Sequence, residues 1–147
     1  MLRKAARHVT QFYDEVIRVT GLKTSQLSLL RAVYFRPGRE LTMGELAEIM
    51  VMDRSTLGHN LRPLERDGLV RLQASPADRR VRIVTLSKKG RAKCEAGAES
   101  WARAQAAFES AFGAESTGRL RQDLFAVASL DFASSPGRNS KSKNPGK

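Results

Sequence analysis

The residues best suited to chemistry lie on one face of an expected helix within the stretch DRSTLGHNLRPLERDGLV, residues 53–70. Leu57, Leu61 and Leu64 recur at intervals of four and three residues, so they form a buried helical stripe. The residues that remain point mostly outward, and they are Arg54, Ser55, Thr56, Gly58, His59, Asn60 and Arg62. Arginine can bind guanine through two hydrogen bonds, asparagine can bind adenine in the same way, and serine or threonine can bind a base or a phosphate. Taken alone, however, a polar face on a surface helix is usually just solvated.

The neighbouring elements decide between these two interpretations. Thr42, with Glu45 three residues later, forms a capping box that predicts a short helix over about 42–50. Asp53 is a suitable N-cap for the next helix, and the short turn between the two is typical of a helix-turn-helix. The second helix of that motif enters the DNA major groove. We therefore expect the polar face to read base edges, with Gly58 permitting close approach of the DNA.

A basic β-hairpin is expected directly after this helix. LVRLQAS and RRVRIVTLS, which begin at residues 69 and 79, are alternating, β-branched runs joined by a turn. A hairpin that follows a helix-turn-helix is a wing. The charged residues in its turn and second run are Asp78, Arg79, Arg80 and Arg82.

Helical periodicity accounts for most of the remaining chain. Apolar stripes predict helices over residues 3–19, from 24 to the Pro-Gly break at 37, from Ser87 to a stop at Gly113, and over about 115–133. The expected apolar face of the long helix from Ser87 to Gly113 holds Cys94, Ala98, Trp101, Phe108 and Phe112. That of the last helix holds Leu120, Leu124, Val127 and Leu130. The expected fold class is mainly α with a small β wing.

The charge balance points to a polyanionic partner. The 147 residues carry 26 Lys and Arg against 15 Asp and Glu, a formal charge of +11. Residues 134–147 hold four of these cations and no apolar residue, so we expect a disordered basic tail after a single domain over 1–133. No apolar run is long enough for a membrane span or signal peptide, and the expected location is the cytoplasm.

Composition and motifs give an enzyme or a metal site little support. One cysteine and two histidines offer few ligands to a transition metal. The sequence has no Gly-rich phosphate loop, G-x-S-x-G elbow or H-E-x-x-H pair. We expect no catalytic activity, no cofactor and no metal, and we interpret Cys94 as a small packing residue with an unreactive thiol.

The motifs LTMGELAEIM, MDRSTLGHNLRPLERDGLV and DRRVRIVTLSKKG resemble the MarR family of winged helix-turn-helix transcriptional regulators. The resemblance covers about residues 5–133, and its most specific parts are TLxxNLxPLExxGLV and the Asp-x-Arg of the wing. It implies a winged module over 24–87 and dimerisation helices over 1–20 and 88–133. The implied partner of the homodimer is a pseudo-palindromic double-stranded DNA operator.

The resemblance also implies roles for the wing residues. Arg80 would enter the minor groove with Asp78 as its brace, and Arg79 and Arg82 would face phosphates. The alternative is that Asp78 and Arg80 are an ordinary exposed pair in a turn, which would contribute little to the stability of the protein. Pro63 departs from normal helix chemistry, because an interior proline removes a backbone hydrogen bond, and we expect it to kink the helix.

Many family members release DNA when a small phenol or aromatic acid binds, which implies a repressor with a ligand pocket. The pocket residues would be Phe12, Tyr13, Arg18, Leu27, Leu30, Arg31 and Tyr34. Aromatic residues on an amphipathic stripe are more often core. The alternative function is a non-specific architectural DNA-binding protein, for which steep salt dependence without sequence preference would be diagnostic.

Overall fold

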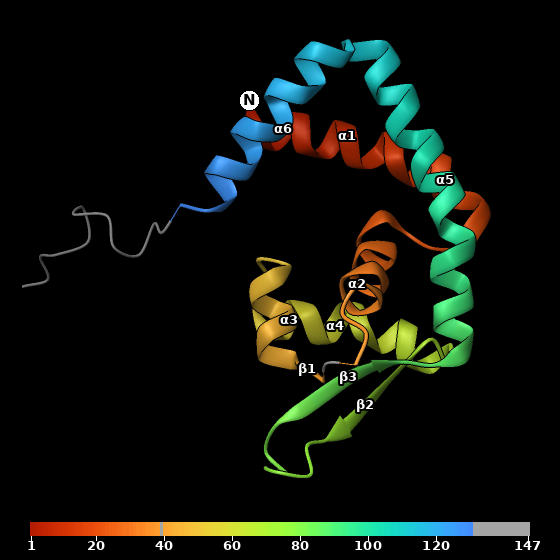
Figure 1. Cartoon of the computed structure of the whole chain (residues 1–147), viewed down its shortest axis with the longest axis vertical. Coiled ribbons are helices and arrows are strands. Elements are labelled where there is room, and N and C mark those ends of the chain that lie inside the picture. The colour runs from red at the N-terminus through yellow and green to blue at the C-terminus, as the bar shows by residue number, and fades with distance from the viewer. Residues whose placement is uncertain (39, 131–147) are drawn as a thin grey trace, which may run out of the picture. The chain divides into compact units, whose positions relative to one another are not determined.

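The computed structural model describes residues 1–38 and 40–130, so the expected tail at 134–147 lies outside the described residues. Figure 1 shows the order of the elements. The helices are α1 (Leu2–Ile17), the 3-10 turn η1 (Arg18–Thr20), α2 (Thr24–Tyr34), α3 (Met43–Ile49), α4 (Arg54–Arg66), α5 (Lys88–Phe112) and α6 (Ala114–Ala128). The strands are β1 (Leu41–Thr42), β2 (Val70–Ala74) and β3 (Arg82–Leu86). This confirms the predicted fold class, and none of the described helices is long and apolar enough to cross a membrane.

Both helices of the helix-turn-helix begin at the capping residues that the sequence predicts, Thr42 and Asp53. The Thr42 hydroxyl accepts a hydrogen bond from the N–H of Glu45, whose carboxylate accepts from the N–H of Thr42. The Asp53 carboxylate caps α4 by accepting a hydrogen bond from the N–H of Thr56, without the reciprocal bond of a capping box. Between the helices, the N–H of Val51 donates to Glu48 and that of Met52 to Ala47, which is the pattern of a Schellman C-cap. The turn places Val51 in the left-handed region, at φ +51°.

The wing belongs to a sheet of three antiparallel strands in the order β1-β3-β2, rather than to a two-stranded hairpin. Leu41 pairs with Val84 and Thr42 with Ile83, so the residues just before α3 attach to the middle strand. The sequence did not indicate β1, because two residues are too few for an alternating pattern. Strand β3 also begins at Arg82, three residues later than predicted.

The core lies around the buried face of α4. Leu57, Leu61 and Leu64 are 0–1% exposed, as their spacing predicts. They belong to one cluster that also contains Leu27, Leu30, Leu46 and Val84. Helix α4 continues through Pro63 without interruption. The carbonyl of Pro63 accepts a hydrogen bond from the N–H of Asp67. The proline therefore does not end the helix, and the expected kink stays a prediction.

The buried face of α5 differs from the expected one. Small residues form it: Gly90, Cys94, Gly97, Ser100 and Ala104. Ala98 and Phe112 are exposed, whereas Trp101 and Phe108 are half-buried. The reason is close packing, because a β-carbon on Gly97 would lie 2.8 Å from Leu27 Cδ1 and one on Gly90 would overlap the carbonyl oxygen of Leu69. Periodicity of large apolar residues does not reveal such a face.

The chain divides into two compact units, Met1–Ala107 and a second that begins at Phe108. In the second unit, Phe108 and Phe112 contact each other with ring centroids 5.7 Å apart. Helix α6 and the residues after it expose several large apolar side chains, namely Leu124, Phe125, Val127 and Leu130. Leu120 is half-buried.

Candidate nucleic-acid interface

All seven residues predicted on the outward face of α4, six polar ones and Gly58, lie together. Together they line a shallow, open hollow on the surface of the helix: Arg54, Ser55, Thr56, Gly58, His59, Asn60 and Arg62. The leucines on the opposite face of α4 are buried, so the helix is fixed to the core on one side and presents hydrogen-bonding groups on the other. This is the geometry that a groove-reading helix requires.

Within this set, Thr56 forms hydrogen bonds with the residue that caps α4, Asp53. Its N–H donates to Asp53 Oδ1 at 2.8 Å, and its hydroxyl donates to Asp53 Oδ2 at 2.7 Å. The side-chain hydrogen bond from Thr56, followed by that from its backbone, lowers the pKa of the Asp53 carboxyl. The cap was predicted, but the use of the Thr56 hydroxyl in it was not.

Two further side chains of the face have specific contacts. Asn60 Nδ2 donates to the carbonyl oxygen of Thr56 at 2.9 Å. The guanidinium of Arg54 lies over α3, with Nη2 3.3 Å from where a β-carbon of Gly44 would be. Ser55, His59 and Arg62 are exposed on the same face.

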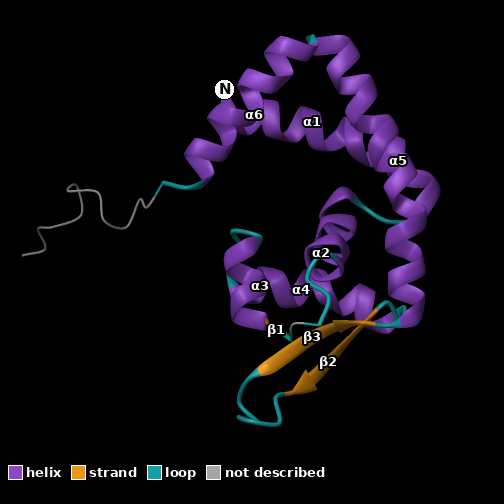
Figure 2. Ribbon diagram, viewed as in Figure 1, coloured by secondary structure: helices purple, strands orange, loops and turns teal. Residues whose placement is uncertain are grey.

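The wing ends in a tight turn that presents two arginines. Figure 2 shows the β2–β3 hairpin extending beyond the helix-turn-helix. Asp78 Oδ1 accepts a hydrogen bond from the backbone N–H of Arg80 at 2.9 Å, and the Asp78 carbonyl accepts one from Val81. Asp78 thus contacts the main chain of Arg80 and fixes the turn, while Arg79 and Arg80 are exposed at the tip.

Arg82 differs from the other wing arginines. It is the first residue of β3, paired with Ala74 of β2. Together with Met43, Glu65 and Leu72 it lines a separate hollow beside α4. Glu65 lines the same hollow, so the surroundings of Arg82 include a carboxylate.

The residues expected to line a ligand pocket are not all in one place. Leu27 and Leu30 are fully buried in the core. Tyr13 is buried against Trp101, with ring centroids 5.2 Å apart, and Phe12 packs edge-on against Tyr13. Arg18 is exposed, pairs with Glu15 at 2.9 Å and lines a different hollow.

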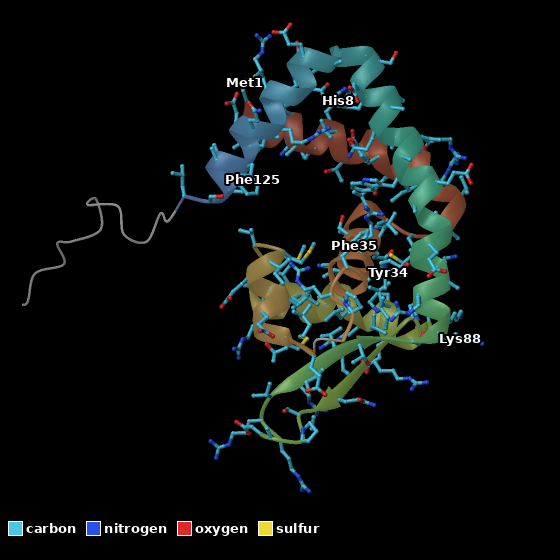
Figure 3. All side chains as sticks on the ribbon, viewed as in Figure 1. Met1, His8, Tyr34, Phe35, Lys88 and Phe125 are labelled. Carbon is cyan, nitrogen blue, oxygen red and sulfur yellow. The ribbon has the colours of Figure 1, made fainter. Side chains whose placement is uncertain are left out.

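Arg31 and Tyr34 belong to a cluster between α2 and α5. The Arg31 guanidinium carbon lies 5.0 Å from the ring centroid of Phe35 and 5.4 Å from that of Trp101. Figure 3 labels Tyr34 and Phe35 at the end of α2. Sequence reasoning missed Phe35 and Trp101 as partners of Arg31. The sequence could have indicated Phe35, because it lies four positions after Arg31 and side chains at that spacing meet on a helix.

The same cluster holds Tyr34 between two charged side chains. The Tyr34 hydroxyl donates to Glu95 Oε1 at 3.1 Å, and this bond raises the pKa of Tyr34. The guanidinium carbon of Arg91 lies 5.4 Å from the Tyr34 ring centroid. These contacts join the start of α5 to α2.

The excess positive charge lies mostly outside the winged module. Residues 40–87 contain seven arginines and seven acidic residues, a formal balance of zero. Four of the six residues from Lys88 to Lys93 are cations, and three more lie at the start of α1. One of these cations has a structural contact, because Lys89 Nζ donates a hydrogen bond to the carbonyl of Asp67 at the end of α4, 2.9 Å away. The net charge of +11 is therefore not a property of the α4 surface itself.

Cys94 is buried, and this burial raises the pKa of its thiol. The thiol is therefore protonated near neutral pH, which agrees with a packing role. Within residues 1–38 and 40–130, no group of three or more His, Cys, Asp and Glu side chains is arranged to hold a metal ion.

Comparison with known proteins agrees with this geometry. The family model described as "MarR family" matches residues 20–81. The M. tuberculosis transcriptional regulator MosR, solved in complex with DNA, is 35% identical, with a TM-score of 0.77 over 86% of this chain and 90% of that one.

Curated relatives match a shorter segment. The transcriptional regulator HosA of Escherichia coli O111:H- is 38% identical over 84 residues, 57% of this chain and 58% of that protein. The transcriptional activatory protein BadR of Rhodopseudomonas palustris is 35% identical over 77 residues, 51% of this chain and 43% of that protein. These matches span about half the length of the curated relatives. With the winged fold, the family-model match and the near full-length likeness to MosR, the chain belongs to the MarR family of winged-helix transcriptional regulators.

Proposed function

We propose that this chain is a sequence-specific regulator of transcription that binds double-stranded DNA, with α4 in the major groove and the wing tip in the minor groove. The observation that carries the proposal is the hollow on α4, where six polar residues and Gly58 lie opposite a buried leucine stripe. Arg80, on a turn fixed by Asp78, extends the surface to a second groove. MosR, the 35% identical relative, was solved in complex with DNA.

The charge distribution favours sequence reading over general coating of DNA. A non-specific binder relies on an excess of cations along its contact surface. Residues 40–87, which contain α3, α4 and the wing, have equal numbers of arginines and acidic residues, so affinity there depends on where individual donors lie. The architectural alternative is therefore the weaker one.

The proposed assembly is a homodimer on a pseudo-palindromic operator. Phe112, Leu124, Phe125, Val127 and Leu130 are 44–75% exposed in the single chain. All five lie within residues 112–130, and large apolar side chains exposed together are candidates for an interface. A twofold dimer presents two copies of α4, and such dimers bind half-sites separated by one helical turn of DNA or a multiple of it.

We further propose that the dimer is a repressor released by a small aromatic acid or phenol. Support comes from Arg31, whose guanidinium lies near the rings of both Phe35 and Trp101, because a cation beside aromatic rings suits an aromatic carboxylate. A thermal-shift screen of such compounds, followed by a DNA-release assay, tests this step. A promoter–reporter assay tests the direction of regulation, since the relative BadR is named as an activatory protein.

The experiment for DNA recognition is a titration of duplexes from the region upstream of the chain's own gene. One duplex should bind at least roughly tenfold more tightly than random DNA at physiological salt. Arg80→Ala should weaken binding while light scattering still shows a dimer. Arg71→Ala, which removes the same charge from β2 away from the tip, is the matched control and should have a smaller effect. Equal binding to all duplexes would overturn the proposal.

A further inference from the structure

We propose that Thr56 positions the first turn of α4 and donates no hydrogen bond to DNA, and that Asn60 is the adenine-reading residue of α4, oriented by the carbonyl group of Thr56. The inference rests on the proposed function and divides the tasks of two residues on its DNA-facing surface. Both residues line the hollow on α4, so position alone does not distinguish them. They are distinguished by the hydrogen bonds that their side chains form.

Thr56 has no hydrogen left to offer to DNA. Both oxygens of the Asp53 carboxylate accept from it, Oδ1 from the N–H at 2.8 Å and Oδ2 from the hydroxyl at 2.7 Å. A hydroxyl carries a single proton, so this one cannot also donate to a phosphate or to an acceptor on a base. The adjacent carboxylate also repels a phosphate. Thr56 therefore acts as a positioning residue for the first turn of α4.

Asn60 lies one helical turn further and retains the groups that adenine needs. A carboxamide has two N–H donors and one acceptor oxygen. One N–H of Asn60 is bound to the Thr56 carbonyl at 2.9 Å, which leaves one donor and Oδ1. Adenine presents an acceptor at N7 and a donor at N6 in the major groove, and a donor–acceptor pair matches both.

The bond between Asn60 and Thr56 also favours binding energetically. A side chain that is already held in place loses less rotational freedom when it contacts DNA. Asp53, Thr56 and Asn60 thus form a chain of contacts along α4, in which each residue fixes the next. By contrast, the exposed side chains of Ser55 and His59 have no such bond among those described, and each offers a base fewer matched groups than a carboxamide.

The test is selection of bound sequences from a randomised duplex pool. The wild type should yield a consensus with adenine at one position of each half-site. Asn60→Ala should reduce that preference from roughly tenfold to about twofold or less, with the other positions unchanged. Asn60→Asp keeps the shape but loses both N–H donors, and it should shift the preference at that position toward cytosine.

Thr56→Val should preserve every base preference and weaken binding to all sequences by a similar factor, because only the cap is impaired. The matched control is Thr85→Val, which removes a hydroxyl from β3 and lies on neither α4 nor the wing tip. It should leave both affinity and preference unchanged. Circular dichroism verifies that each variant is folded.

Two results would overturn the inference while leaving the proposed function intact. The first is a wild-type consensus that neither Asn60 variant alters. The second is a change of preference at a single position in Thr56→Val. A wild type that selects no consensus would instead remove the proposed function, and this inference with it.

Discussion

The backbone of Gly90 in α5 lies directly against the peptide carbonyl of Leu69, where the chain leaves α4 and enters the wing. A β-carbon on residue 90 would overlap the Leu69 oxygen and lie 2.8 Å from its carbonyl carbon. Ser87 reinforces this contact, because its hydroxyl donates to the carbonyl of Gly68 at 2.6 Å and accepts from the N–H of Gly90 at 2.9 Å. The end of α4, the wing and α5 are thereby held together at one point.

Gly90→Ala should consequently destabilise the protein, by about 1–3 kcal/mol, because backbone atoms must move to admit the methyl group. The measurement is the free energy of unfolding from denaturant titration. Gly58→Ala is the matched control, since a β-carbon there meets nothing within 4 Å. It should stabilise by about 0.5–1 kcal/mol, because alanine favours a helix over glycine. Equal effects of the two substitutions would show that the contact with Leu69 is not tight.

Val51 occupies the left-handed position of the turn between α3 and α4, at φ +51° and 81% exposed. A β-branched residue is strained there, whereas glycine is the usual residue at this position of a Schellman cap. Val51→Gly should raise the free energy of unfolding by about 0.5–1 kcal/mol, since relief of strain exceeds the added entropy of the unfolded chain. Val19→Gly, at another exposed valine, should lower it. Destabilisation by both would contradict the assigned turn.

Asp53 should make stability depend on pH in the acidic range. Hydrogen bonds from Thr56 lower its pKa below the ordinary value of 3.8. A carboxyl whose pKa is depressed in the folded state contributes stability above its unfolded value and loses that contribution as the pH falls through the folded value. The contribution is therefore complete above about pH 3.8 and declines below it.

The comparison is with Asp53→Asn, because asparagine also caps helices well but does not titrate. Denaturant titrations at a series of pH values should show the wild type losing more stability than this variant below pH 3.8. Parallel curves would mean that the carboxylate is not bonded as described.

Cys94 should be nearly inert in the folded protein, because burial raises the pKa of its thiol and restricts access to it. A thiol reagent should react far more slowly with native protein than with protein in denaturant. Mild peroxide should release neither the wild type nor Cys94→Ala from DNA. Release of the wild type alone would assign a redox role to this residue.

Local signals predicted the parts of the fold that a few neighbouring residues determine. The capping box of Thr42 and Glu45 and the cap at Asp53 were correctly placed, because each depends on residues three apart. The leucine stripe of α4 was correct because helical geometry alone decides which side chains share a face. These two patterns together were enough to group the six polar residues and Gly58 on the outward face of α4.

The missed features depend on distant contacts. Strand β1 forms only because Leu41 and Thr42 meet Val84 and Ile83 about forty residues later. The buried face of α5 consists of small residues because Leu69 and Leu27 pack closely against Gly90 and Gly97. One local contact was also not predicted, namely the hydrogen bond from the Thr56 hydroxyl to Asp53, because residue spacing does not determine how a hydroxyl is oriented.

The most direct measurement of the role of α4 is the ratio of two affinities at physiological salt. One is for a duplex selected from a random pool, and the other is for a scrambled duplex of the same composition. If the face around His59 and Asn60 reads bases, the ratio should exceed roughly tenfold, and the selected duplex should contain two related half-sites about one helical turn apart. A ratio near one, with affinity that falls steeply as salt rises, would contradict sequence reading and identify a non-specific DNA-binding protein.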